Sequence, residues 1–552
     1  MSRSHRWALA LFIGLLCLWP LRGALWQGAV PGAGPDVVST LWGNWWAQQV
    51  GLRDAMGSDT LLVNHPYGAS GSVLSPLGAA AWAAGDVLLG PTAGAVLSAW
   101  LTIAGFALGV SWLALRCRTG PWGALAAGMV VISSRYLFFG VGEGSPVAVA
   151  ALPIPLGVAG LLAAREGRWL GGLAAAAMMA WTAAENPYLA PALPVLGALM
   201  WLEVAWRGRD GRPLMISLML GAAGVMAFAG LFSRTASPDY PREVAGETVA
   251  LLGRRWAVVD LPWARATPTD LLWPGEVRWT LSAQDAQDAT GGRYLGLVGL
   301  MLALLSLRLR PREALPWLLL AAAGISLSIG SVQSGLAGPF LFLNGFMDAV
   351  ARPLTQPTRF LIFALLGLAL AAGFAVRELR SRFGRRAAAA AAGLVLLDGL
   401  CFGGLSLDLP ETTLPDASCL SGLEGGVLLW PWDATDGEQS TAQRYQIQHG
   451  QPSPQTGIAS WALSEAGRAA GAVRGAGWAQ GQLSRLNRNK LLDLGYRWAI
   501  VEVDADPGGA RAVAAALSAA TPETCGGLAI YSLIEAAPAW PGPRQGRPGL
   551  HR

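Results

Sequence analysis

The sequence predicts an α-helical polytopic membrane protein with about 11 transmembrane helices and a small C-terminal α/β domain. Of its 552 residues, 53% are apolar and only 14% are charged, and the mean hydropathy is +0.41. A soluble chain of this length would have a much larger charged surface. The basic residues are almost all arginines, and they lie at the ends of apolar segments. The net charge of +5 therefore reflects membrane topology rather than binding to nucleic acid.

A helix needs about 20 consecutive apolar residues to cross a bilayer. Apolar runs that are long enough lie near residues 7–25, 93–115, 121–139, 146–164, 169–184, 188–206, 213–233, 293–309, 314–331, 358–376 and 387–406. Segment 73–90 is ambiguous, because it is apolar but short and contains Pro76 and Asp86.

The arginines decide how segment 73–90 is interpreted. If it does not cross and Met1 is inside, every short inside connection is basic, and the short outside loops around 140–146 and 185–188 contain no Arg or Lys. This bias is the one that the positive-inside rule requires, and a crossing at 73–90 would reverse it in every later loop. We therefore predict a re-entrant or interfacial helix there, with the N-terminus inside and the C-terminus outside. The inside arginines are Arg3, Arg6, Arg116, Arg118, Arg165, Arg168, Arg207, Arg209, Arg212, Arg308, Arg310, Arg312, Arg377, Arg380, Arg382, Arg385 and Arg386.

The first span has a basic start and Ala24 near its end, which fits either a cleavable signal peptide or an uncleaved anchor. We interpret it as an anchor. The chain is then a multi-pass protein of a bacterial inner membrane, with its C-terminal domain in the periplasm.

We expect a transmembrane domain over 1–406, an extracytoplasmic α/β domain over 407–535 and a disordered tail over 536–552. Outer loops at 26–92 and 234–292 interrupt the transmembrane domain. The α/β domain is expected to contain strands at 426–430, 498–503 and 527–533 and a helix at 508–520.

The cysteines agree with this placement. Cys419 and Cys525 both fall in the outside domain, in a compartment where disulfides persist, and we predict that they form a bridge. Cys17, Cys117 and Cys401 lie in or beside spans, where a cysteine is usually a small apolar residue.

Several kinds of chemistry find no support in the sequence. The four histidines are not spaced with one another or with cysteine as a zinc site needs, and no phosphate-binding loop of the GxxxxGK[ST] type occurs. A secondary transporter stays open as an alternative, although the interiors of the spans are nearly free of acids: Asp398 lies inside the last span and Glu203 near an inner end.

Acidic residues gather instead at the predicted outer mouth. Asp36 precedes VVSTLWGNWWAQQ, which is predicted to be an amphipathic helix with Trp42, Trp45 and Trp46 at the membrane interface. A carboxylate in this position either caps the helix or binds and deprotonates a hydroxyl.

Two more acids, Glu143 in GVGEGSP and Glu185 in AENPY, lie in the outer loops that lack arginine. Each is either an ordinary loop residue or part of a polar site. His65 is placed where it could move a proton, although a loop histidine can also be purely structural.

The order of these features resembles the integral-membrane glycosyltransferases of the GT-C superfamily. The resemblance rests on the long first loop with its acid and Trp-rich helix, NHPYGASG at 64–71, PTDLLWP, GGRYLGLVGL at 291–300, RPLTQPTRF at 352–360 and a C-terminal outside domain with GVLLWPW and YQIQHGQP. It covers nearly the whole chain in layout, but each motif is short.

The resemblance implies transfer of a hexosyl or pentosyl group from a polyprenyl-phosphate donor to a cell-envelope glycan or lipid on the outer face. Asp36 would match the first-loop acid that acts as base or orients the acceptor, and Glu143 would match a second acid. The DxD-like pair that some members use for a metal is missing, so we predict no metal site among these residues and leave a divalent metal open.

The resemblance also implies binding residues for the donor and acceptor. Arg352 and Arg359 would hold the lipid phosphate, with Arg293 and Tyr294 in support, and His65 and Glu185 would lie near the same mouth. The alternative for the two late arginines is anchoring of a span at the interface. The alternative for the whole chain is a non-catalytic scaffold, or a transporter or flippase, with the same layout.

Overall fold

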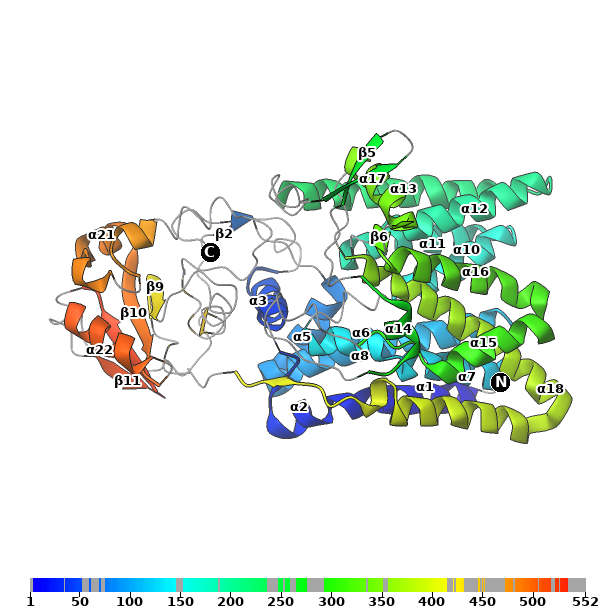
Figure 1. Ribbon diagram of the computed structural model, residues 1–552, viewed down its shortest axis with the longest axis horizontal. Helices are drawn as coiled ribbons and strands as arrows, with labels where there is room; N and C mark the ends of the chain where they lie inside the picture. The colour runs from blue at the N-terminus through cyan, green and yellow to red at the C-terminus, as the bar shows by residue number, and fades with distance from the viewer. Residues whose placement is uncertain are drawn as a thin grey trace. The chain divides into compact units, whose positions relative to one another are not determined.

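The computed structural model contains two compact units (Figure 1). The helical unit comprises Met1–Ala33, Leu74–Ser233 and Asp239–Thr412, and the α/β unit comprises Gly34–Val73, Arg234–Pro238 and Thr413–Arg552. Half of the predicted first outer loop therefore belongs with the C-terminal part of the chain. The structure describes residues 3–33, 35–51, 59–60, 69–70, 75–144, 152–186, 189–235, 247–251, 254–258, 265–275, 292–333, 336–350, 356–414, 420, 423–430, 445–446, 449, 451, 472–479, 482–504, 506–517, 522–525 and 527–534.

Many helices of the helical unit begin with proline, whose fixed φ and missing N–H suit the first helical turn. Its principal helices are α1 (Arg3–Leu18), α2 (Arg22–Gln27), α5 (Pro76–Leu89), α6 (Pro91–Arg116), α7 (Gly120–Ser133), α8 (Arg135–Gly142), α10 (Pro153–Arg165), α11 (Trp169–Glu185), α12 (Ala192–Trp206), α13 (Arg212–Thr235), α14 (Pro268–Leu272), α15 (Leu297–Leu309), α16 (Pro311–Ser328), α17 (Pro339–Val350) and α18 (Leu361–Cys401). Short 3-10 turns η1 (Trp19–Leu21), η5 (Pro357–Phe360) and η6 (Gly404–Ser406) adjoin them.

The rest of the helical unit is short antiparallel pairs of strands. They are β1 (Val30–Pro31) with β8 (Glu411–Thr412), β4 (Glu247–Leu251) with β5 (Arg254–Val258), and β6 (Val332–Gln333) with β7 (Leu336–Ala337).

Three helical stretches among the described residues are long and apolar enough to cross a membrane, namely Trp7–Gln27, Pro91–Arg116 and Pro357–Cys401. The bent pair of α7 and α8, with an angle of 42° between them, could form a fourth. Shorter apolar helices lie at Pro76–Leu89, Pro153–Arg165, Ala192–Trp206, Arg212–Phe228 and Leu297–Leu309. These features fit a polytopic membrane fold, and the number of 11 spans stays a prediction.

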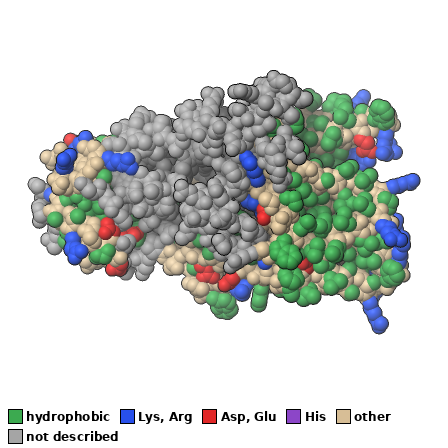
Figure 2. All heavy atoms as spheres, in the orientation of Figure 1, with side chains coloured by type: hydrophobic (Ala, Val, Ile, Leu, Met, Phe, Trp, Pro, Cys, Tyr) green, Lys and Arg blue, Asp and Glu red, His purple; other side chains and the backbone are tan. Residues whose placement is uncertain are grey.

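The surface of the helical unit is divided between apolar sides and one basic end. Figure 2 shows hydrophobic side chains over its visible side and Lys and Arg side chains gathered at the end where α18 turns back. Trp7 and Trp206, at the start of α1 and the end of α12, are 70% and 94% exposed. Exposed tryptophans beside arginines are typical of a membrane–water interface. We call this the basic end, and its arginines come from the connections that the sequence places inside.

Helix α18 folds back on itself at Gly384, whose φ of 83° and ψ of −174° are not helical. Its first half places Gly373 against Gly123, near the start of α7, and its second half places Gly399 against Ser133, at the end of α7. The two halves therefore run in opposite directions along α7, as the ribbon in Figure 1 also shows. They correspond to the predicted segments 358–376 and 387–406, with the basic stretch between them at the turn.

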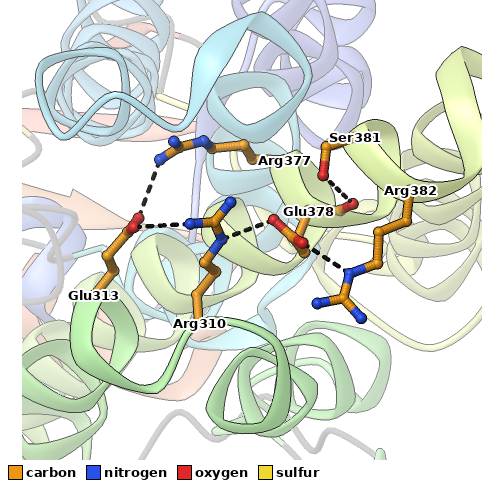
Figure 3. A network of polar contacts seen from close by, with 6 residues as sticks. All are labelled: Arg310, Glu313, Arg377, Glu378, Ser381 and Arg382. Carbon is orange, nitrogen blue, oxygen red and sulfur yellow. Dashed lines mark hydrogen bonds and ion pairs between the residues drawn. The ribbon is translucent and has the colours of Figure 1, made fainter.

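An ion-pair network at the basic end connects α18 to the junction of α15 and α16 (Figure 3). Arg310 Nε and Arg382 Nε each lie 2.7 Å from a different carboxylate oxygen of Glu378, and Arg377 Nη1 lies 3.0 Å from Glu313 Oε2. The Glu378 side chain is only 8% exposed, so the two guanidinium groups offset the cost of burying its charge.

Helix α5 confirms that segment 73–90 is helical. It packs antiparallel on the first part of α6, with Gly85 against Gly94 and Gly78 near Ser98. Its 14 residues extend about 21 Å, less than the roughly 30 Å of a hydrocarbon core. Whether it is re-entrant or spanning stays a prediction.

The α/β unit contains a mixed four-stranded sheet in the order β11-β12-β10-β9. Strands β9 (Gly426–Trp430) and β10 (Tyr496–Glu502) are parallel, and β12 (Leu528–Ser532) is antiparallel to both β10 and β11 (Glu523–Cys525). The three predicted strands occur close to their expected positions. The described helices of the unit are α3 (Pro35–Val50), α21 (Arg488–Asp493), α22 (Pro507–Ala516) and the turn η8 (Leu483–Arg485), and a pair of short strands, β2 (Asp59–Thr60) and β3 (Ala69–Ser70), completes it.

Both faces of this sheet are buried. Leu428 and Trp430 join α22 and Trp478 in one hydrophobic cluster. Val427 and Leu429 join Tyr445 in a second cluster on the other face. Tyr445 therefore packs on the face of the sheet that lies opposite α22.

We expect the Gly367→Ala substitution to destabilise the helical unit. A Cβ at this position of α18 would lie 2.3 Å from the backbone oxygen of Trp317 in α16, so the helices would have to separate, at a cost of about 1–3 kcal/mol. Thermal unfolding of the purified protein in detergent measures the effect.

Gly393→Ala is the matched control, because Gly393 lies in the same helix with nothing within 4 Å of an added Cβ. Alanine should leave its melting temperature unchanged or raise it. Equal loss of stability in both variants would contradict the close packing of α16 on α18.

Candidate functional site

A polar cluster surrounds Tyr136 at the end of the helical unit opposite the basic end. Tyr136 lies in the first turn of α8, and its hydroxyl donates to the backbone oxygen of Arg359 over 3.3 Å. It is close enough to Arg359, Glu143 and Arg293 to interact with all three electrostatically. Three predicted site residues, distant in sequence, therefore lie within electrostatic range of one tyrosine that the sequence did not indicate.

Helix α8 is held in place by its first residues. The Ser134 hydroxyl accepts from the N–H of Tyr136 and caps the helix, and it donates to the backbone oxygen of Tyr294. Arg135 donates through Nε to the oxygen of Phe402 and through Nη1 to that of Gly275, both over 2.6 Å. Arg135 therefore connects the start of α8 to the end of α18 and to the loop after α14.

Arg293 is held by an almost buried ion pair. Its Nη1 lies 3.4 Å from Asp270 Oδ2, and the two side chains are 11% and 8% exposed. Asp270 belongs to α14, where it forms a capping box with Thr267, and Arg293 Nη1 also donates to the backbone oxygen of Arg265. These contacts fix the guanidinium group in one position before any ligand arrives.

Glu143 and Arg359 complete the cluster. Glu143 is the exposed C-cap residue of α8, within electrostatic range of Arg293. Arg359 lies in η5, partly exposed, with its Nε donating to Gln356 Oε1 over 2.6 Å. An arrangement of this kind brings cations suited to a phosphate near a carboxylate suited to a hydroxyl.

Tyr294 and Glu185, two further predicted binding residues, are engaged in contacts within the protein. The Tyr294 hydroxyl donates to Asp398 Oδ1 over 2.6 Å and accepts from the N–H of Leu297. The buried carboxylate of Glu185 accepts from the Leu77 N–H over 2.7 Å, from Trp181 Nε1 over 2.8 Å and from the Ser75 hydroxyl. Both residues thus stabilise the helical unit, and their binding to a substrate stays a prediction.

The remaining predicted residues are placed less fully. His65 and Arg352 lie outside the described residues. Asp36 lies in the first turn of α3. Cys525 is disulfide-bonded while Cys17, Cys117 and Cys401 are free, and the predicted partner Cys419 is outside the described residues, so the pairing stays a prediction.

One expectation about α3 is wrong. Trp42, Trp45 and Trp46 are only 1%, 8% and 2% exposed, so they are packed inside the protein rather than presented to a membrane interface. The three tryptophans lie three and four positions apart and so share one side of the helix, an apolar side that could face either lipid or protein. Burial then depends on which segment covers the helix, which sequence spacing does not show.

Arg135 and Asp270 are parts of the cluster that the sequence analysis missed. A signal for Arg135 existed, because it is a basic residue inside the apolar run 121–139, and ionisable residues within such runs usually have a function. Asp270 carried a weaker signal as the acid of a Thr-Pro-Thr-Asp helix start.

His449, in the YQIQHGQP motif, is a buried histidine of the α/β unit. Its Nδ1 accepts from the N–H of Gln451 over 2.9 Å. Burial lowers the pKa of His449 to about 3, so the ring is neutral at physiological pH. It packs within the protein.

The fold is similar to that of solved membrane enzymes. ArnT from Cupriavidus metallidurans bound to undecaprenyl phosphate matches with a TM-score of 0.51 and 13% identity over 97% of this chain and 98% of that chain. The archaeal oligosaccharyltransferase AglB from Archaeoglobus fulgidus, in complex with an inhibitory peptide and a dolichol-phosphate, matches with a TM-score of 0.50 and 12% identity over 98% of this chain and 75% of that chain. The chain has the GT-C fold. No protein-family model and no curated protein sequence matches it.

The GT-C resemblance expected from the order of the motifs is thus confirmed at the level of the fold. The GT-C layout extends over both units, because each of the two matches covers nearly the whole chain. Within the described residues, no group of three or more His, Cys, Asp or Glu side chains is arranged to hold a metal ion. Whether this protein requires a divalent metal stays open.

Removal of the Glu185 carboxylate should loosen the start of α5. Glu185→Ala leaves the Leu77 N–H and Trp181 Nε1 without their acceptor, at about 1–3 kcal/mol for each buried donor. Hydrogen exchange over 76–80 should increase and the melting temperature should fall. Glu185→Gln retains an acceptor oxygen and should restore both; a glutamine variant as impaired as alanine would instead indicate that the charge itself is needed.

The α/β unit should lose stability in acid because of His449. The unfolded chain binds a proton near the ordinary histidine pKa of about 6.5, whereas the folded unit does not bind it until about pH 3. The free energy of unfolding should therefore fall by about 1.4 kcal/mol for each pH unit below 6.5, in addition to the effect of other groups.

Urea unfolding of the parent and of His449→Asn at several pH values measures this contribution. Hydrogen exchange of β9 is the probe that reports unfolding of the α/β unit. Asparagine retains an acceptor for the Gln451 N–H and does not titrate. The difference in stability between the two proteins should change with pH, and a constant difference would contradict the buried neutral ring.

Proposed function

We propose that the chain is a membrane glycosyltransferase that moves a sugar from a polyprenyl-phosphate donor to a cell-envelope acceptor on the outer face of a bacterial inner membrane. The observation that carries the proposal is the placement of Arg293, Arg359 and Glu143 within electrostatic range of Tyr136, on a GT-C fold, at the end opposite the basic end. Both matched structures contain a polyprenyl phosphate, undecaprenyl phosphate in ArnT and a dolichol-phosphate in AglB.

The reaction would join the acceptor oxygen to the anomeric carbon of the donor sugar. Either Asp36 or Glu143 acts as the base and takes the proton from the acceptor hydroxyl as the new C–O bond forms. The bond from that carbon to the phosphate oxygen breaks, and polyprenyl phosphate leaves with the electron pair. A single displacement inverts the sugar carbon, so a β-linked donor would give an α-linked product.

The arginines would serve the leaving group. A guanidinium group binds two phosphate oxygens in its plane and stabilises the charge that develops as the bond breaks. Arg293 is preorganised for this by Asp270 and by the backbone of Arg265, so little reorganisation is needed during the reaction. Arg359 lies in the turn that enters α18, and the bond from Tyr136 holds its backbone.

The transporter alternative depends on acids within the spans. In the structure Asp398 accepts from the Tyr294 hydroxyl, and Glu203 pairs with Arg165 at 2.6 Å and with Arg207 at 2.8 Å. These pairs bind α18 to the start of α15 and α10 to the end of α12. Both acids thus have a stabilising role in the fold, which favours the enzyme over an ion-coupled carrier.

Membrane fractions supplied with labelled polyprenyl-phosphate sugars test the proposal. The parent should transfer label, Asp36→Asn should lose most of the transfer, and Arg359→Gln should raise the KM for the donor about tenfold or more, because a charge-assisted bond to phosphate is lost. Arg312→Gln is the matched control, since Arg312 is an exposed arginine at the basic end.

Equal effects of Arg312→Gln and Arg359→Gln would remove the phosphate role of Arg359. Equal transfer by the parent and Asp36→Asn would remove Asp36 from its role. No transfer with any donor, together with movement of a labelled lipid across proteoliposomes, would favour the flippase.

A further inference from the structure

Helix α3 is bonded to a segment that lies 404 residues later in the chain. Trp42 Nε1 donates to Gln446 Oε1 over 2.8 Å, and both side chains are buried. Both residues belong to the α/β unit. Because Asp36 lies in the first turn of α3, this contact attaches the helix of the predicted catalytic acid to the C-terminal part of the chain.

The Gln446 side chain is fixed by a second hydrogen bond. Its Nε2 donates to the backbone oxygen of Gln451 over 2.9 Å. Gln451 in turn donates its N–H to His449 Nδ1 and accepts from the N–H of Gly425 through Oε1 over 3.0 Å. Gly425 directly precedes β9, so a continuous series of hydrogen bonds leads from α3 to the four-stranded sheet.

The surroundings of this series leave Gln446 little freedom. Gln446 is 0% exposed and Trp42 is 1% exposed. The Trp42 ring packs against Trp46 with 5.5 Å between centroids and against Trp45 with 6.2 Å. The buried Gln446 amide both donates and accepts a hydrogen bond, so it has one favourable orientation. The Trp42 indole N–H points in one fixed direction from its ring, so the bond between the two side chains also fixes the ring.

We propose that Gln446 is a positioning residue for Asp36, acting through Trp42 and α3. The inference rests on the proposed function, because it assumes that Asp36 reacts. Asp36 and Trp42 are six positions apart in the helix, about 9 Å along the axis, and a helix of this length transmits a shift at one end to the other. Loss of the bond between Trp42 and Gln446 would allow α3 to rotate or slide and move the carboxylate away from the acceptor hydroxyl.

The inference predicts a particular kinetic pattern. The phosphate of the donor is assigned to Arg293 and Arg359 in the helical unit, which the bond does not involve. Misplacement of Asp36 should therefore lower kcat about tenfold and leave the KM for the lipid donor within about twofold, as small displacements of a reacting group have large effects on rate. A general loss of folding would also lower the apparent kcat at constant KM, so kcat is referred to the amount of folded protein, and an unchanged melting temperature separates the two cases.

Four variants of the full chain in detergent test the proposal: Trp42→Phe, Gln446→Leu, the double variant, and Trp46→Phe as the matched control. Trp46 is buried on the same helix and packs against Trp42, so its replacement removes similar ring volume without breaking the bond to Gln446. We measure kcat, the KM for the donor, the melting temperature and hydrogen exchange of α3.

The two single variants and the double variant should show the same loss of kcat, because they break one interaction, and the same faster exchange over 35–50. Trp46→Phe should retain kcat. Unchanged exchange of α3 in Gln446→Leu, additive losses in the double variant, or an equal loss in Trp46→Phe would each overturn the inference. If the parent transfers no sugar, the proposed function fails, and exchange of α3 still tests whether Gln446 holds the helix.

Discussion

The reversal of α18 on α7 is the constraint on which the candidate site depends. Gly384 has a positive φ that other residues rarely adopt, so a glycine is required where the helix turns back. The first half follows the turn η5, where the Arg359 backbone accepts from Tyr136, and the second half ends just before Phe402, whose backbone oxygen accepts from Arg135. Both ends of the hairpin therefore arrive at the start of α8. The glycines that contact α7 and α16 allow this approach, since helices in lipid associate through close packing and hydrogen bonds.

Buried charges at both ends of the helical unit are paired with charges of opposite sign, which offsets the cost of burying them. At the basic end, Glu378 is compensated by two arginines, and at the other end Asp270 compensates Arg293. An unpaired charge in either place would be expensive, so each pair also fixes the helices that carry it. The result at the site end is a guanidinium group that is already oriented beside an exposed carboxylate, Glu143. Preorganisation of this kind is what a reaction that moves a phosphate-linked group needs.

Within the α/β unit, the first-loop helix α3 is bonded to the C-terminal part of the chain. The sheet of this unit packs against α22 on one face and against Tyr445 on the other. Gln446, the next residue, holds α3 through Trp42, so the first loop and the C-terminal part of the chain form one body.

The sequence by itself determined the features that depend on local spacing and on the sidedness of lipid. Apolar length predicted the helices, arginine positions predicted the basic end, alternating apolar residues predicted the strands, and the order of short motifs predicted the GT-C fold. It also gave Glu143, Arg293 and Arg359 as candidates, and the structure places all three within electrostatic range of Tyr136. Only the tertiary structure separated Glu143 from Glu185, two acids in similar loops, because one is exposed and the other caps α5 from α11. It likewise decided that the tryptophans of α3 are buried, because their partner lies 404 residues away, and local periodicity carries no information about so distant a contact.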